Sequence, residues 1–173
     1  MSIWGGITGG LVGFVVLGPI GALVGSVIGS NISSRSKRRR PNNLDQQVAF
    51  FAALFACLAK IAKADGRVDE AEIKKIEEII SSKLNLNKEH RHFAINIFQK
   101  AKEDNISFEA YASNLYQILS SSPNSLLVFY EMLFELALAD GILHPNEDAL
   151  LKKIPRIFRF DEKVYKSLYE KFV

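Results

Sequence analysis

The side chains best suited to chemistry are acids in a short motif that occurs twice. The first copy, I-A-K-A-D-G-R-V-D-E-A-E at 61–72, aligns with L-A-L-A-D-G-I-L-H-P-N-E at 136–147. The aligned acids are Asp65 with Asp140 and Glu72 with Glu147, each pair 75 positions apart. Carboxylates are the oxygen donors that a hard cation such as Ca²⁺ takes. The D-x-D-x-D-G calcium loop is absent, however, so the spacing alone predicts no site of that kind.

Helix termination explains much of this motif. Gly66 and Gly141 are suited to the left-handed residue that closes a helix. Asp69 with Glu72 matches a capping box at the start of the next helix. The motif is therefore also what two tight helix–helix corners require.

Helix termination and capping do not explain the two motif aspartates, Asp65 and Asp140. Each follows a helix C-terminus, where the helix dipole disfavours a negative charge by roughly 0.3–1 kcal/mol. They require a compensating donor or cation. Pairing with Lys63 or Arg67 is the alternative to a metal ion.

No residue set in the sequence predicts catalysis. The single cysteine, Cys57, lies in the apolar run 50–58 and suits a buried position, and one cysteine excludes an internal disulfide or a cysteine-based metal centre. His90 and His92 would point to different faces of a helix, and His144 is distant in sequence. H-E-x-x-H, Walker, dinucleotide and G-x-S-x-G motifs are all missing. We predict that the chain is not an enzyme.

The charge is unevenly distributed. Residues 1–43 hold five Lys/Arg and no acid, while the remainder is slightly acidic, so the net charge of +3 comes from one short cluster. A nucleic-acid-binding domain would spread its basic side chains over a folded face. We therefore predict no nucleic-acid partner.

The N-terminal segment has the composition of a membrane span. No charged residue occurs in 3–32, and about 20 apolar residues cross a bilayer as a helix. A signal peptide would carry its positive charge before the apolar run. The basic residues that follow it predict a single-pass protein of the bacterial inner membrane, N-terminus out and C-terminal domain cytoplasmic. These topology residues are Arg35, Lys37, Arg38, Arg39 and Arg40.

Glycines in the predicted transmembrane helix, residues 1–32, recur every fourth position. Such stripes allow two helix backbones to approach closely, which predicts a homodimer within the membrane in addition to contact with lipid. The stripe residues are Gly5, Gly9, Gly13, Gly21, Gly25 and Gly29. Pro19 predicts a kink in one span, and a hairpin of two short helices is the alternative.

The rest of the chain predicts an all-α bundle. A polar basic linker at 33–43 precedes the domain 44–173, whose apolar residues recur at three and four positions. The segment 48–64 is apolar nearly all round, which is typical of a helix surrounded by others. About seven helices with an internal two-fold repeat are expected, at 48–64, 69–84, 88–103, 108–119, 126–139, 145–154 and 162–172.

The doubled A-D-G-x5-E pattern on two apolar helices resembles the TerB-like fold of tellurite-resistance proteins, an all-helical domain of about this size. The order of parts is more narrowly similar to the N-terminal region of DjlA-type membrane-anchored co-chaperones: W-G, a glycine-rich span, a basic cluster, F-F-A-A-L-F at 50–55 and G-I-L-H-P-N-E at 141–147. The resemblance covers essentially all 173 residues.

In that family a J-domain follows, and its H-P-D tripeptide stimulates the ATPase of the major heat-shock chaperone. Here His144-Pro145-Asn146 reads H-P-N and lies within the A-D-G repeat, so we expect no co-chaperone activity from this polypeptide itself. A truncated co-chaperone and a free-standing protein remain alternatives. The resemblance implies a membrane-anchored adaptor or regulatory module in stress or envelope quality control, with a protein partner in the chaperone system.

The resemblance also implies that the acids of the two motifs meet in one patch. The positions carried over are Asp65, Glu72, Asp140 and Glu147, with Asp69 nearby. A divalent-metal sensor or buffer of the Ca²⁺ type is therefore the alternative function, and no other cofactor is expected. An apolar groove for a partner helix is a further possibility, with Phe108, Tyr111, Tyr116 and Tyr130 expected to be partly exposed.

Overall fold

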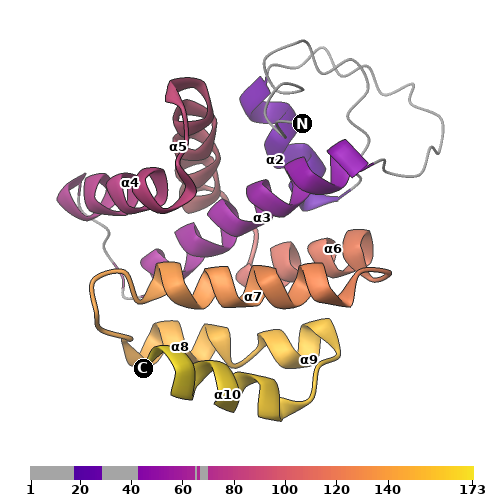
Figure 1. Cartoon of the computed structure of the whole chain (residues 1–173). Coiled ribbons are helices and arrows are strands. Elements are labelled where there is room, and N and C mark those ends of the chain that lie inside the picture. The colour runs from indigo at the N-terminus through magenta and orange to yellow at the C-terminus, as the bar shows by residue number, and fades with distance from the viewer. Residues whose placement is uncertain (1–17, 29–42, 65, 67–69) are drawn as a thin grey trace.

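The computed structural model describes residues 18–28, 43–64, 66 and 70–173 (Figure 1). Within these residues every regular element is a helix and there is no strand, which confirms the all-α prediction. The helices in chain order are α2 (Pro19–Ile28), α3 (Asn43–Lys63), α4 (Glu70–Leu84), α5 (Lys88–Glu103), α6 (Phe108–Leu119), α7 (Pro123–Ala137), α8 (Pro145–Leu151), α9 (Ile154–Phe158) and α10 (Glu162–Phe172).

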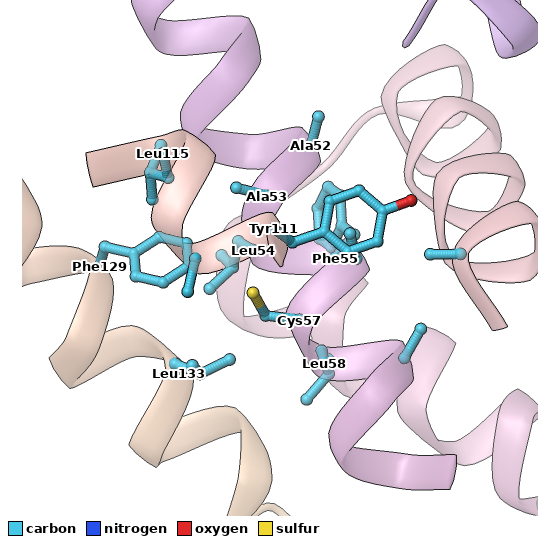
Figure 2. Close-up of a cluster of buried hydrophobic side chains, with 14 of the residues drawn as sticks. Ala52, Ala53, Leu54, Phe55, Cys57, Leu58, Tyr111, Leu115, Phe129 and Leu133 are labelled. Carbon is cyan, nitrogen blue, oxygen red and sulfur yellow. The ribbon is translucent and has the colours of Figure 1, made fainter. Parts of the chain in front are cut away.

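Helix α3 forms the centre of the bundle, as its sequence predicts. Its eight consecutive residues 52–59 are at most 3% exposed. Alanine and cysteine take up little space on this helix, so α2, α5, α6, α7 and α8 all contact it. Figure 2 shows Leu115 of α6 and Phe129 of α7 beside the α3 segment that carries Leu54 and Cys57.

This central helix also has the length and composition of a membrane span. In the described part of the chain, one stretch passes that test, Gln46–Lys63, and 61% of it is buried inside the protein. Its apolar side chains are therefore solvated by neighbouring helices.

Side-chain caps fix the helix starts that the sequence predicts. Asn87 accepts from the His90 backbone N–H at 2.9 Å, and Ser107 accepts from that of Ala110 at 3.1 Å. These bonds satisfy amide groups that have no partner within the helix. As a result α5, α6 and α10 have the bounds expected from the sequence.

The helix expected at 145–154 is divided into α8 and α9, so eight helices are described from Asn43 onward where the sequence predicts about seven. The cause is Pro155, which has no N–H to donate to the carbonyl four residues earlier. That carbonyl, on Leu151, instead accepts the Tyr130 hydroxyl at 2.7 Å. A tertiary contact from α7 therefore replaces the missing helical hydrogen bond.

Helix α2 lies in the second half of the predicted span, and it packs against α3, α5 and α6 (Figure 1). It begins at Pro19, where the sequence predicts a kink, and its Ile20, Leu23 and Val24 are 0%, 6% and 0% exposed. At about 1.5 Å per residue, ten residues cover roughly half of the hydrocarbon core. In this structure the bundle covers the apolar face that the sequence assigns to lipid. The remainder of the predicted span, 1–17 and 29–32, lies outside the described residues.

Candidate functional site

The two copies of the acidic motif form the corners α3–α4 and α7–α8. Gly66 and Gly141 have φ of 106° and 85°, the left-handed conformation expected of the residue that closes a helix. The Gly66 N–H donates to the Lys63 carbonyl at 2.9 Å, and the Gly141 N–H donates to the Leu138 carbonyl at 2.8 Å. The two glycines therefore share one backbone conformation and one hydrogen-bond pattern.

The two corners touch. The Asn146 side-chain amide of the second copy donates to the Ala64 carbonyl of the first at 3.3 Å, and α8 contacts α3. Residues 82 positions apart are joined here. The described parts of the two motif copies are therefore in contact, and the meeting of their acids in one patch stays a prediction.

The described acids of the second corner accept hydrogen bonds from nearby backbone. Asp140 Oδ1 accepts the Ile142 N–H at 3.0 Å, and Glu147 Oε2 accepts the His144 N–H at 3.0 Å. The Ile142 N–H is the compensating donor that Asp140 requires at its place after a helix. Pro145 is the first residue of α8, so local capping accounts for this copy of the motif.

The first corner is only partly described. Asp65, Arg67 and Asp69 lie outside the described residues, as does the Glu72 side chain. The Lys63 ammonium donates to the Lys102 carbonyl at 2.9 Å. Among the described side chains, no group of three or more His, Cys, Asp or Glu is placed to hold a metal ion. The four-carboxylate cation site remains a prediction.

The remaining nucleophile and imidazole candidates lie as the sequence predicts. Cys57 is 0% exposed, and burial raises the pKa of its thiol, so it behaves as a small apolar side chain. His90 is buried while His92 is exposed, which agrees with opposite faces of α5.

A buried polar cluster joins α3 to the α5–α6 loop, and the sequence analysis did not identify it. Lys60 Nζ lies 2.7 Å from Asp104 Oδ1, and their side chains are 10% and 27% exposed. The Tyr111 hydroxyl donates to the other Asp104 oxygen, and the Ile106 N–H donates to Oδ1 at 2.9 Å. Burial, followed by that hydrogen bond, raises the pKa of Tyr111. The available signal was Lys60, one of only three charged residues in the apolar helix α3.

Three of the four aromatic residues expected to be partly exposed are buried, which corrects that expectation. Phe108, Tyr111 and Tyr130 are 3%, 1% and 0% exposed, and Tyr116 alone is half-buried. The bundle needs these rings for its core, where Tyr111 projects beside α3 (Figure 2).

A groove of about 520 Å³ lies elsewhere, between the first turns of α3 and the N-terminal half of α7. Its apolar lining includes Phe50, Phe51, Leu119, Val128 and Met132. Val128, on the rim of this groove, is 48% exposed.

The predicted membrane residues are described only in α2. Gly21 and Gly25 are half-buried there, and Gly5, Gly9, Gly13 and Gly29 lie outside the described residues. The basic cluster at 35–40 also lies outside the described residues.

The start of α2 is held by Asn114, which the sequence analysis did not single out. Asn114 is 6% exposed on α6, and its Oδ1 accepts the Ile20 N–H at 3.0 Å. The clue in the sequence was an amide side chain three residues after Tyr111, which places Asn114 on the same buried face of α6.

Comparison with known families divides the chain as the resemblance does. Residues 51–169 match the family described as tellurite resistance protein TerB. Residues 1–39 match the family described as the co-chaperone DjlA transmembrane domain.

Several curated relatives are described as co-chaperone protein DjlA. The chain is 37% identical to that of Photobacterium profundum over 124 residues, which is 72% of this chain and 44% of the relative. It is 31% identical to that of Vibrio parahaemolyticus over 123 residues (71% and 43%), and 33% identical to that of Escherichia coli (strain K12) over 110 residues (64% and 40%). The chain thus spans less than half the length of these relatives. No solved structure matches it significantly.

Proposed function

The chain belongs to the TerB family, and from that premise we propose that it is a membrane-anchored, non-enzymatic adaptor of the DjlA type. The carrying observation is that two separate parts point to the same co-chaperones. The N-terminal residues match the DjlA transmembrane domain, and the helical domain aligns with DjlA proteins. We place its role in stress or envelope quality control, beside a protein of the chaperone system.

The proposed topology is a single pass through the inner membrane, with the N-terminus outside and the bundle in the cytoplasm. The basic cluster at 35–40 supports this orientation because positive side chains are retained on the cytoplasmic face. Reporter enzymes fused at either end test it. A periplasmic signal from the N-terminal fusion and a cytoplasmic signal from the C-terminal fusion are expected; a cytoplasmic N-terminus would favour the hairpin.

The groove between α3 and α7 is the proposed partner surface. Gln46 and Gln47 line it in the first turns of α3, directly after the basic linker, so it lies at the end of α3 that follows the membrane segment. Phe50 and Val128 provide apolar contacts that an amphipathic helix of a partner would bury.

A photo-reactive benzoyl-phenylalanine introduced at Val128 tests this surface in membranes. The matched control position is Ile142, an apolar residue that is 59% exposed outside the groove. A discrete adduct at Val128 that is missing at Ile142 would support the groove as the adaptor surface. Equal or no adducts at both positions would contradict it.

Divalent-metal binding is the second candidate, because the Asn146–Ala64 hydrogen bond brings the two acidic corners together. Asp140 and Glu147 would supply carboxylate oxygens from one corner, and Asp65 and Glu72 would supply them from the other. Calorimetric titration of the full chain with CaCl₂ tests it, with the Asp65→Asn, Asp140→Asn double variant as control. Heat that survives the double substitution would remove these acids from the proposal.

A further inference from the structure

Helix α2 packs against the surface that α3, α5 and α6 form together, which we call the α3–α5–α6 groove (Figure 1). On α2, Ile20, Leu23 and Val24 face this groove and are almost fully buried. Ala22 and Ser26 lie on the opposite side and are exposed. The helix therefore has one face toward protein and one exposed face, a difference that a helix solvated by lipid on every side would not need.

The contact is specific at the start of α2. The first amides of a helix have no partner within it, and the Ile20 N–H donates at 3.0 Å to Asn114, 94 positions away. Gly18, one residue before α2, has φ of 96°, and a Cβ there would lie 2.8 Å from the Asn114 amide nitrogen. Neither a larger residue at position 18 nor an apolar residue at position 114 would reproduce this fit.

The same helix belongs to the segment that matches the DjlA transmembrane domain. Without α2, the uncharged residues 3–17 number fifteen, fewer than the roughly 20 that cross a bilayer as one helix. A single span of the kind proposed above therefore requires α2 in the membrane. One helix cannot lie in the bilayer and in the α3–α5–α6 groove at the same time.

We propose that the α3–α5–α6 groove, with Asn114 at its end, is a docking site for the second half of the membrane segment, and that α2 exchanges between this groove and the bilayer. The inference rests on the proposed membrane anchoring. Off the membrane, α2 covers the groove and removes Ile20, Leu23 and Val24 from water. On insertion, the groove opens beside the bilayer surface. Gly18 and Pro19 form the joint, because a proline there interrupts a continuous helix.

Cysteine labelling of the full chain tests the exchange. The variants Ala22→Cys, Leu23→Cys and Ser167→Cys are made by cell-free synthesis, with and without phospholipid vesicles, and treated with a membrane-impermeant maleimide. Ser167 is exposed on α10 and reports a residue in water. The native Cys57 is buried with a raised thiol pKa and provides the unlabelled baseline.

Without vesicles we expect Ala22→Cys to label like Ser167→Cys while Leu23→Cys is protected. With vesicles we expect both α2 positions to be protected and Ser167→Cys to label. Adding Asn114→Ala to Leu23→Cys removes the acceptor, and loss of a hydrogen bond of about 1 kcal/mol should raise vesicle-free labelling about fivefold.

Two results would overturn the proposal. Equal labelling of Ala22→Cys and Leu23→Cys without vesicles would show that α2 is not docked. Continued labelling of Ala22→Cys in chains that float with the vesicles would show that α2 never leaves the groove. A chain that does not float with vesicles at all would instead refute the anchoring on which the exchange rests.

Discussion

Asp104 provides a sharp test of how the bundle is held together. Its carboxylate accepts from Lys60, Tyr111 and the Ile106 N–H, and Lys60 is only 10% exposed. In Asp104→Ala the Lys60 ammonium keeps its buried position but loses the carboxylate. Removing one partner of a buried pair costs about 3–5 kcal/mol, and we expect about 3 kcal/mol because Asp104 retains some exposure.

The matched control is Lys153→Ala, which breaks an ion pair with Glu109 whose side chains are 47% and 42% exposed. Exposed pairs contribute at most about 1 kcal/mol. Urea unfolding of the full chain in nonionic micelles, followed by circular dichroism, measures both free energies. The double variant Asp104→Ala, Lys60→Met removes the stranded charge and should recover about 1–3 kcal/mol relative to additivity. Equal losses for Asp104→Ala and Lys153→Ala would refute the reasoning.

Three further predictions concern the corners and the buried hydroxyls. Tyr130→Phe leaves the Leu151 carbonyl without its donor and should lower the free energy of unfolding by about 1–2 kcal/mol in the same urea assay; no change would mean that water or another group replaces the hydroxyl. Gly141→Ala meets no atom within 4 Å, so its cost should be the left-handed strain alone, about 1–2 kcal/mol; a value near zero would contradict the backbone geometry. Burial raises the pKa of Tyr111 and Tyr165 above the ordinary value of about 10, so the folded state keeps protons that the unfolded state releases. Stability should therefore be full below about pH 10 and fall as the pH rises further, and Tyr111→Phe should weaken that dependence; unfolding curves unchanged between pH 9 and pH 11 would contradict it.

Helix bounds were predictable where local chemistry determines them. Asn87 and Ser107 cap α5 and α6 through amides three residues away, a signal contained within four residues of sequence. The central helix was predictable because a segment that is apolar all round must be surrounded. The left-handed conformation of Gly66 and Gly141 was likewise predictable from their immediate sequence neighbours.

What the sequence could not predict depends on contacts between distant residues. Pro155 divides α8 from α9, but the hydroxyl that satisfies the carbonyl it leaves without a donor comes from Tyr130, which the local sequence does not indicate. The docking of α2 was not predictable because an apolar pattern does not distinguish lipid from a protein groove as its solvent. Asn114, 94 positions from Ile20, makes that distinction here.

In the candidate site too, some features are determined by neighbouring residues and others by contacts between residues far apart in the sequence. Capping explains Asp140 and Glu147 from their immediate neighbours. The prediction that the acids of the two corners meet came from family resemblance, and it stays a prediction, although Asn146 of one copy contacts Ala64 of the other. The Lys60–Asp104 pair joins residues 44 positions apart, which spacing along one helix cannot reveal.

Membrane anchoring through the N-terminal segment is the central claim, and sedimentation of bacterial membranes washed in 1 M salt tests it most directly. At that ionic strength the screening length falls to about 3 Å, so attraction between the 35–40 cluster and anionic lipid is removed. We predict that the full chain stays in the pellet and is released only by detergent. Recovery of the chain as a soluble monomer in the salt wash would contradict the account.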